Sequence, residues 1–331
     1  MNHFRSKNEV YIIAEIGGNH EGNFEYAKEL TKLAALSGAD AVKFQVYTGD
    51  SLVNKRYDPT RNKHFKKFEL SKEQYIELAE LCDDLDITFM ASVWDIDAFS
   101  YIDKYMPIYK VGSGDMTAYN LIKKMVLTGK PIILSTGLAT FNEVKSVISF
   151  IESIDQRYIE NKKLALLQCT SMYPIPDSDA NLNVINTYID KFDIPIGYSD
   201  HTVGMDAIEI SVAMGAKIIE VHFTDERKGK KFRDHKVSAT KDEIIGLINK
   251  IKKIRTLQGS FEKQPTQSEI KSGHLKSFRR GLFARSDLKE GHTITKKDLI
   301  SLRPLVETGA EDYYNLIGKI TTKKISKFEK L

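Results

Sequence analysis

The chain has 331 residues, of which 41% are hydrophobic, and its 49 basic residues nearly balance its 45 acidic ones. Because a net charge of +4 leaves no concentrated basic face, we expect no nucleic-acid partner. No apolar run approaches the roughly 18 residues of a membrane span, and MNHFRSKNEV is too polar for a secretory signal. Cys82 and Cys169 lack CxxC spacing and are expected to be reduced, so the sequence predicts a soluble, cytoplasmic protein without a membrane partner.

Short runs rich in valine and isoleucine alternate with amphipathic segments of helical period, which is typical of parallel βα units. Helices are predicted between the strands, for example over 24–38, 71–85 and 141–154, and a last one over 241–259. The pattern after the sixth strand is short and irregular. The eight predicted strands cover residues 10–17, 41–46, 87–93, 108–113, 131–136, 163–170, 194–200 and 217–224.

Eight parallel strands with following helices predict an α/β fold, a (β/α)₈ TIM barrel over residues 1–258. An open doubly wound sheet is the alternative, but the first turn, GGNHEGN, lacks the GxGxxG fingerprint of that fold. Residues 259–276 are polar and predict a linker. Residues 277–331 show short alternating strands around a KEGH turn, which predict a small, mostly β domain. So small a unit has little core, and we expect it to pack on another surface.

Polar side chains gather at the ends of nearly all predicted strands, where the active sites of TIM barrels form. Two of them are histidines, His201 and His222, at matching depth on the seventh and eighth strands. A lone histidine in an apolar strand is more often a hydrogen-bonded core residue, but this adjacent pair predicts a shared divalent metal. With carboxylates such as Glu15 and Asp234 nearby, Mn²⁺, Fe²⁺, Co²⁺ or Zn²⁺ suits the pair better than Mg²⁺ or Ca²⁺.

Two lysines, Lys43 and Lys110, lie inside predicted strands between apolar residues. An unpaired ammonium group is costly there, so an anionic ligand explains them better than snorkelling does. Ser113, Ser135 and Ser199 add hydroxyl groups at strand ends, of the kind that hold phosphate or carboxylate. The residues therefore predict a barrel enzyme with a divalent metal and a small anionic substrate.

Several separated motifs stand at the predicted strand ends. They are AEIGGNHEG (14–22), VKFQ (42–45), YKVGSGD (109–115), PIILSTG (131–137), LLQCTSMYPIP (166–176), GYSDHT (197–202) and EVHFT (220–224). Together they resemble the sialic acid synthase family, whose members make nonulosonic acids from phosphoenolpyruvate and an N-acetylated mannosamine-type sugar. The tail SFRRGLFARSDLKEGHTITKKDLISLRP resembles the C-terminal antifreeze-like (SAF) domain of that family, so the likeness covers essentially the whole chain.

The resemblance implies a role for each matched position. His201 and His222 would bind a catalytic Mn²⁺, with Mg²⁺ or Co²⁺ as alternative ions, and Glu15 or Asp234 would position the attacking water. Arg303 would reach from the SAF domain of a partner chain into the barrel mouth, which implies a domain-exchanged homodimer. The residues implied for phosphoenolpyruvate are Lys43, Lys110, Ser113, Ser135, Ser171 and Ser199, and those for the N-acetylated hexosamine are Gln45, Asn62, Tyr173 and Arg303.

The chain departs from the family pattern near the expected sugar pocket. The third strand ends Ser92-Val93-Trp94 where a Thr-Pro-Phe-like end is common, and Ser171 replaces an asparagine of some members. Position 168 is glutamine, and Leu305 follows SLRP where a Gly-Asn-Gly-like stretch is usual. The acceptor is therefore left open between N-acetylmannosamine and the di-N-acetylated 6-deoxy sugars of the legionaminic and pseudaminic routes. A phosphorylated acceptor is less expected, because no extra basic cluster is evident.

Two other functions compete with this one. A Schiff-base aldolase would use Lys43 or Lys110 as its amine and would leave the histidine pair without a role; borohydride trapping distinguishes it. A non-catalytic sugar-binding or regulatory protein on a decayed barrel is the second rival. A barrel that has lost its activity should first lose the polar residues at its strand ends. In this chain nearly all predicted strands still end in polar residues.

Overall fold

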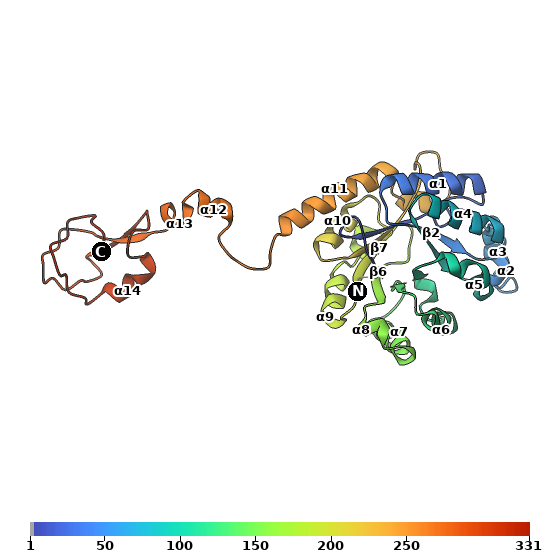
Figure 1. Cartoon of the computed structure of the whole chain (residues 1–331), viewed down its shortest axis with the longest axis horizontal. Coiled ribbons are helices and arrows are strands. Elements are labelled where there is room, and N and C mark those ends of the chain that lie inside the picture. Colours follow the sequence, from blue (N-terminus) through green and yellow to red (C-terminus); the bar gives the residue numbers. More distant parts are fainter. Residues whose placement is uncertain (1–2) are drawn as a thin grey trace. The chain divides into compact units, whose positions relative to one another are not determined.

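The protein is described by a computed structural model that covers residues 3–331. The chain divides into two compact units, Met1–Gly259 and Ser260–Leu331. In the first unit, eight parallel strands close into a barrel in chain order, each hydrogen-bonded to the next and β8 to β1 (Figure 1). This closure confirms the predicted TIM barrel and excludes the open sheet. The strands are β1 Tyr11–Glu15, β2 Ala41–Val46, β3 Thr88–Val93, β4 Tyr109–Val111, β5 Ile132–Ser135, β6 Leu164–Cys169, β7 Ile196–Asp200 and β8 Ile218–His222.

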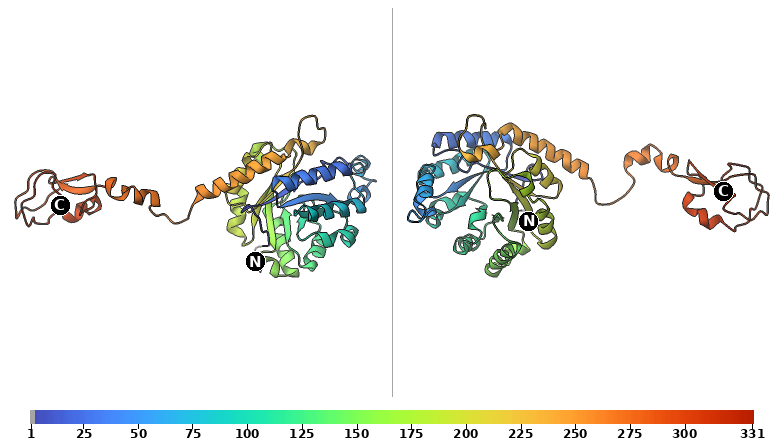
Figure 2. Two further views of the ribbon diagram at one scale, coloured as in Figure 1. Left: turned by 45° about the horizontal axis from the view of Figure 1, so that its top comes forward. Right: turned by 180° about the vertical axis from the view of Figure 1, so that it is seen from behind.

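Helices surround the strands, as the three views of Figures 1 and 2 show. Their starts are encoded locally: Ser71, Thr140 and Thr240 each cap a helix through a reciprocal capping box. Gly38 ends the first helix with φ 82°, a left-handed conformation that favours glycine. The main helices are α1 Phe24–Ser37, α4 Lys72–Asp84, α6 Tyr119–Thr128, α7 Phe141–Ile154, α9 Asn183–Lys191, α10 Asp206–Ala213 and α11 Lys241–Gln258.

Shorter helical segments lie in the connections between these elements. The irregular pattern noted after the sixth strand corresponds to a 3₁₀ turn, η4 Asp177–Asp179, ahead of α9. The others are α2 Gly49–Leu52, α3 Pro59–Lys66, η1 Ile96–Ala98, α5 Phe99–Ile102, η2 Asp103–Tyr105, η3 Ser113–Asp115, α8 Arg157–Glu160 and η5 Arg233–Val237.

The inward-facing side chains change character along the barrel axis. Near the N-terminal ends of the strands they form an apolar plug, which includes Ile13, Met90 and Ile218. Because side chains alternate between the two faces of a strand, the inward positions two residues further on are Glu15, Ser92 and Glu220. The outward positions pack against the helices in a separate, larger cluster. The same alternation therefore builds a dry core at one end of the barrel and a charged layer at the other.

The second unit is small and only sparsely stranded. Its strands β9 Gly281–Ala284 and β10 Leu299–Leu302 pair in antiparallel fashion. The flanks of the KEGH turn do not pair with each other as a hairpin would; single bridges join Leu288 to Ile325 and Thr293 to Ile320. The region expected to be a linker contains two short helices. The helical elements of this unit are α12 Gln267–Lys271, α13 His274–Ser277, η6 Ala310–Asp312 and α14 Tyr313–Leu316.

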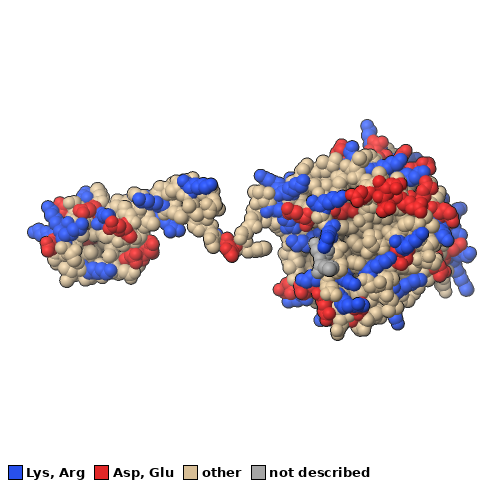
Figure 3. Space-filling view, viewed as in Figure 1, with Lys and Arg blue, Asp and Glu red and all other residues tan. Residues whose placement is uncertain are grey.

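The surface carries mixed charge. On the face shown in Figure 3, basic and acidic side chains are interspersed over both units, with acidic side chains gathered in one band of the barrel unit. This pattern agrees with the near balance of 49 basic and 45 acidic residues. Among residues 3–331, no helix combines the length and apolar character needed to cross a lipid bilayer.

Candidate active site

A cavity of about 1050 Å³ opens at the C-terminal ends of the barrel strands. Of the fourteen residues that the sequence analysis assigned to the site, twelve line this cavity, and Asn62 and Arg303 do not. Their roles remain predictions, but the fold brings them together from six of the eight strands and from the segments that follow the strands. The twelve are Glu15, Lys43, Gln45, Lys110, Ser113, Ser135, Ser171, Tyr173, Ser199, His201, His222 and Asp234.

Two lysines and two glutamates form a buried charge cluster on the floor of the cavity. Lys43 Nζ lies 2.7 Å from Glu15 Oε2 and 3.8 Å from Glu220 Oε2. Lys110 Nζ lies 3.4 Å from Glu220 Oε1. The β1–β2 and β1–β8 registers create this arrangement, because they place Glu15 beside Lys43 on one side and beside His222 on the other. Since buried ions are tolerated only when paired, the two carboxylates explain how the lysines stay charged without a ligand.

The pairing also sets the protonation of the cluster. Burial by itself would raise the pKa of Glu220, but Lys110, Lys43 and the Ser199 hydroxyl lower it to about 2. Burial raises the pKa of Glu15, an effect that Lys43 only partly offsets. Burial also lowers the pKa of Lys110, whereas Glu15 and Glu220 outweigh burial and raise that of Lys43. Glu15 is therefore the carboxylate of the cluster that is nearest to taking up a proton.

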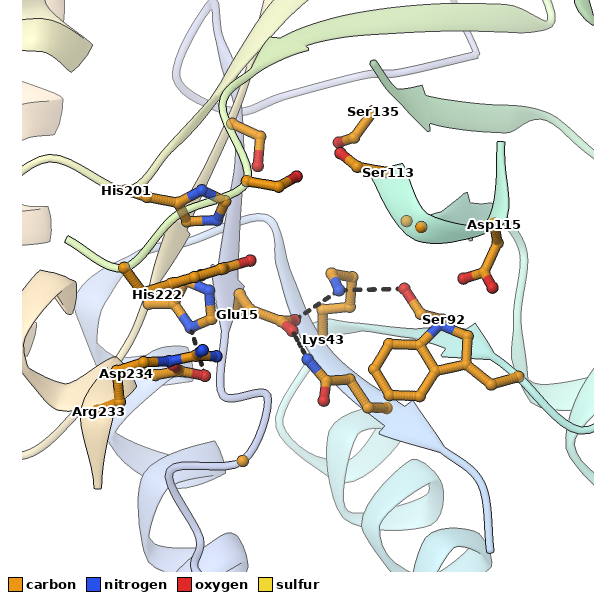
Figure 4. A pocket seen from close by; sticks show the side chains of 18 of the residues that line it. Glu15, Lys43, Ser92, Ser113, Asp115, Ser135, His201, His222, Arg233 and Asp234 are labelled. Carbon is orange, nitrogen blue, oxygen red and sulfur yellow. Dashed lines mark hydrogen bonds and ion pairs between the residues drawn. The ribbon is translucent and has the colours of Figure 1, made fainter. Parts of the chain in front are cut away.

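Hydroxyl groups complete the floor around the two ammonium groups. Lys110 Nζ donates to Ser135 Oγ at 2.8 Å. Lys43 Nζ donates to Ser92 Oγ at 3.3 Å (Figure 4). Next to them, the bare Cα of Gly137 faces the hydroxyls of Ser113 and Ser171, which a side chain at this position would strike. Ammonium groups and hydroxyls are the usual means of holding phosphate or carboxylate.

The two histidines lie together on the wall of the cavity, with ring centroids 5.4 Å apart. His201 Nδ1 lies 2.7 Å from the carbonyl oxygen of Thr170, so this nitrogen carries the proton and Nε2 keeps its lone pair. Burial lowers the pKa of His222 to about 4, which keeps its ring neutral. His222 Nδ1 is buried, lacks a hydrogen-bond partner within residues 3–331 and lies 4.0 Å from Asp234 Oδ2.

These features fit the expected divalent metal. Neutral imidazoles with a free lone pair are good ligands for Mn²⁺ and its neighbours, and an unpartnered buried nitrogen gains from coordination. In the described part of the chain, no group of three His, Cys, Asp or Glu side chains converges on a point. The histidine pair would therefore hold the ion together with oxygen atoms of water or substrate.

Asp234 and Tyr173 link the histidines to the mouth of the cavity. Tyr173 packs its ring 4.0 Å from that of His201, and the guanidinium group of Arg233 lies 4.3 Å above the same tyrosine. Arg233 Nε also donates to Asp234 Oδ1 at 2.9 Å, so one carboxylate oxygen is held by the arginine and the other faces His222 (Figure 4). A cation–π contact and an ion pair together fix this corner of the site.

Asn62 is placed differently from its expected role in sugar binding. Its side chain is buried, and its amide donates to the carbonyl oxygens of Gly49 and Val53 and to Asp50 Oδ1. The cavity is instead lined by its helix neighbours Arg61 and His64. The position of Asn62 therefore supports a structural role, in which it fastens α2 and the following Val53 to α3.

We expect Asn62→Ala to lower the free energy of unfolding by about 1–3 kcal/mol, because three acceptors lose a buried donor. Urea denaturation of the variant measures the change. Asn54→Ala is the matched control, since Asn54 accepts one exposed backbone hydrogen bond from Arg56 and should shift stability by less than about 0.5 kcal/mol. Equal stability of Asn62→Ala and the unchanged protein would contradict this structural role.

Arg303 belongs to the second unit, where its guanidinium group lies 5.4 Å above the ring of Phe278. Its expected insertion into the barrel of a partner stays a prediction. Other polar residues at strand ends face away from the cavity: Gln168 donates to Ala180, Thr136 donates to Leu167, and Asp200 accepts from Tyr198 and Thr202. Strand-end position alone therefore does not identify a site residue.

The sequence analysis assigned no role to Glu220, which lies in the motif EVHFT near the end of the eighth strand. Side chains alternate between the two faces of a strand, and Glu220 precedes His222 by two positions. Glu220 must therefore share the face of His222, which the sequence already indicates. An aromatic wall was missed entirely. It consists of Tyr47, Phe65 and Trp94, whose ring centroids lie 5.3 to 6.4 Å apart and which all line the cavity.

Comparison with known proteins yields a consistent set of similarities. Residues 30–263 match the NeuB family. A relative from Methanocaldococcus jannaschii, the uncharacterized protein MJ1065, is 38% identical over 89% of this chain and 85% of that protein. The N,N'-diacetyllegionaminic acid synthase of Legionella pneumophila is 36% identical over 96% of this chain and 91% of that protein. The crystal structure of N-acetylneuraminic acid synthetase from Leptospira borgpetersenii superposes with a TM-score of 0.73 at 31% identity, covering 80% of this chain and 90% of that one.

Proposed function

The chain belongs to the NeuB family, and from this premise we propose that it is a nonulosonic acid synthase. The reaction joins phosphoenolpyruvate to an N-acetylated sugar of the mannosamine type and releases inorganic phosphate. The observation that supports this most directly is the pair of buried lysines, Lys43 and Lys110, on the floor of the cavity beside the histidine pair. The named synthases among the relatives support the same chemistry.

Phosphoenolpyruvate carries a carboxylate and a phosphate, and the floor of the cavity offers complementary groups. Lys43 and Lys110 bind the carboxylate and the phosphate of phosphoenolpyruvate. The hydroxyl groups of Ser135, Ser113 and Ser171 donate further hydrogen bonds to these two groups. Glu15 forms an ion pair with the ammonium group of Lys43, and Glu220 forms one with that of Lys110. They hold both lysines in place before the substrate arrives, so little reorganisation is needed on binding.

Carbon–carbon bond formation then occurs between the two substrates. C3 of phosphoenolpyruvate attacks the aldehyde carbon of the open-chain sugar, whose oxygen takes up a proton, and C2 becomes electron-deficient. Water adds to C2, the bond between C2 and the phosphate oxygen breaks, and inorganic phosphate leaves. Glu15, which Gln45 orients by a 2.9 Å hydrogen bond, positions the water and accepts its proton. Asp234, which also lines the cavity, is the alternative carboxylate for this role.

His201 and His222 would hold the divalent ion, Mn²⁺ by resemblance to the family. When bound, this ion supplies Lewis-acid polarisation of the aldehyde oxygen. Tyr173, packed against both rings, keeps the histidines in place and excludes water from that side. The chain's own residues at this corner therefore orient the two imidazoles.

The proposal predicts sugar-dependent release of phosphate from phosphoenolpyruvate. We expect purified protein with Mn²⁺ to release phosphate only when an N-acetylated hexosamine is present, and EDTA to abolish the release. A colorimetric phosphate assay with and without each component measures this. Release that ignores the sugar, or none with any sugar from a folded protein, would contradict the proposed function.

The second unit enters the proposal as an antifreeze-like domain. In a domain-exchanged homodimer it would bring Arg303 to the sugar site of the other chain. Light scattering that shows a monomer at assay concentration would contradict this arrangement.

A Schiff-base aldolase is the second candidate, because burial lowers the pKa of Lys110 and so favours a nucleophilic amine. It gives the histidine pair no task. Borohydride reduction in the presence of a carbonyl substrate would label Lys110 covalently in that case, and mass spectrometry would detect the adduct.

A further inference from the structure

Asn19 carries a buried amide in the turn that follows β1. Its Nδ2 atom donates two hydrogen bonds of 2.8 Å, one to the main-chain oxygen of Phe223 and one to Ser238 Oγ. Its Oδ1 atom is also buried but has no hydrogen-bond partner among the residues that the structure describes. An unpaired buried acceptor is unfavourable, so the two groups that Nδ2 holds explain this residue better than stability does.

The first of the two hydrogen bonds holds the main chain directly behind His222. Phe223 follows His222, the last residue of β8, and its amide donates to the carbonyl oxygen of Glu15 at 2.8 Å. The carbonyl oxygen of His222 accepts from the Ala239 amide at 2.7 Å. Together with the bond from Asn19, these contacts hold the peptide groups that follow His222 at three points. The imidazole of His222 therefore projects from a firmly held piece of chain.

The second hydrogen bond leads to Asp234. The hydroxyl of Ser238 accepts from Asn19 and donates to the main-chain oxygen of Asp234 at 2.7 Å. Asn19, Ser238 and Asp234 are all buried, so water does not compete for these bonds. The same amide that holds the end of β8 therefore also holds η5, the turn that carries Asp234.

His222 and Asp234 do not hold each other in place. His222 Nδ1 and Asp234 Oδ2 face each other at 4.0 Å (Figure 4), which is beyond the range of a hydrogen bond. Arg233 binds the other carboxylate oxygen, but its side chain is 60% exposed, and exposed ion pairs contribute little. The separation of the imidazole and the carboxylate is therefore set mainly by the main chain behind them.

We propose that Asn19 and Ser238 are positioning residues of the active site; this inference rests on the proposed function. They join the chain behind His222 to the chain that carries Asp234. In this way they set the imidazole that would bind the divalent ion against the carboxylate that faces it. Neither Asn19 nor Ser238 lines the cavity, so both act through these two residues and not on the substrates.

Asn19→Ala removes both hydrogen bonds at once. We expect the variant to bind Mn²⁺ about 10- to 100-fold more weakly, the usual effect of losing a group that orients a metal ligand, and its kcat to fall as well. The KM for phosphoenolpyruvate should change by less than about twofold, because Asn19 does not touch the lysines of the floor. Electron paramagnetic resonance of added Mn²⁺ measures binding, the phosphate assay measures kcat and KM, and urea denaturation measures the folded fraction.

Ser238→Ala interrupts the same chain of hydrogen bonds by the loss of one oxygen atom. It should weaken Mn²⁺ binding by about fivefold, as expected for one hydrogen bond. Ser211→Ala is the matched control, because Ser211 is also buried and donates to the main-chain oxygen of Ile208 at 2.7 Å, within α10 and outside the cavity. The control should lose a similar amount of stability but leave Mn²⁺ binding and kcat unchanged.

The outcomes separate this inference from the proposed function. Unchanged Mn²⁺ binding and kcat in folded Ser238→Ala protein, or an equal loss of both in Ser211→Ala, would overturn the positioning role and leave the synthase function standing. If the unchanged protein binds Mn²⁺ but releases no phosphate with any sugar, the synthase function is wrong, and the Mn²⁺ affinities of the variants still decide the positioning role. Absence of Mn²⁺ binding by the unchanged protein would overturn the metal assignment and the positioning role together.

Discussion

Replacing Lys43 by methionine is expected to lower the free energy of unfolding by about 3–5 kcal/mol, the usual cost of removing one partner from a buried ion pair. Lys43 lies between Glu15 and Glu220, and all three side chains are buried. Without the ammonium group, two carboxylates face each other across the floor with Lys110 as the remaining cation. Turnover should fall by a factor of about 10² to 10³ or more, because a preorganised cation for the anionic substrate is lost. Urea denaturation and the phosphate assay measure the two effects.

A double variant separates stability from catalysis. Adding Glu15→Gln to Lys43→Met removes the unpaired charge at nearly constant volume, and should restore most of the lost stability but none of the activity. Lys162→Met is the surface control, because the Lys162–Asp193 pair is exposed and should contribute less than about 1 kcal/mol. A single variant Lys43→Met that unfolds at the same urea concentration as the unchanged protein would show that the cluster is hydrated and not dry.

His222→Ala is expected to abolish binding of Mn²⁺ and to reduce turnover by about 10³-fold or more, if the metal contributes several kcal/mol to the transition state. His222 ends β8 with a buried, unpartnered Nδ1, so its loss leaves His201 as the only imidazole at this corner. Electron paramagnetic resonance of Mn²⁺ titrated into the protein measures binding directly, apart from activity. Circular dichroism checks that the barrel is intact.

His20→Ala is the matched control for this variant. His20 is also buried in the first unit, but it accepts a hydrogen bond from the Gly22 amide and does not line the cavity. The His20→Ala variant should bind Mn²⁺ as the unchanged protein does. Near-normal turnover by metal-stripped His222→Ala protein would remove the basis for assigning the metal to this pair.

Local signals explain why the secondary structure was predictable. Thr140 and Glu143 form the capping box that starts α7, and Thr240 and Glu243 do the same for α11. The predicted strand over 41–46 matches β2 residue for residue. In the second unit the local pattern misleads, because the segments around the KEGH turn pair with the distant C-terminal residues Ile320 and Ile325.

Side-chain direction explains the residues that were placed less well. Asn62 lies in the short helix α3 next to the cavity, and nothing in its local sequence reveals that its amide turns inward to Gly49 and Val53. Gln168 and Asp200 stand at strand ends like Ser199 but on the outer face. Loop geometry depends on tertiary packing, so a motif can locate a neighbourhood without fixing which side chain enters the site.

Sequence alone determined the barrel and the chemical character of its open end. The alternation along each strand requires that Glu15 share a face with Ile13, and Glu220 with His222, whatever the neighbours are. Only the tertiary structure decided which of these polar groups meet. Lys43 meets Glu15 through the register of the neighbouring strands β1 and β2. Lys110 meets Glu220 because closure of the barrel turns β4 and β8, which are not neighbours in the sheet, toward a shared interior. The energetic reason for those pairings, mutual compensation of buried charge, exists only once the strands are side by side.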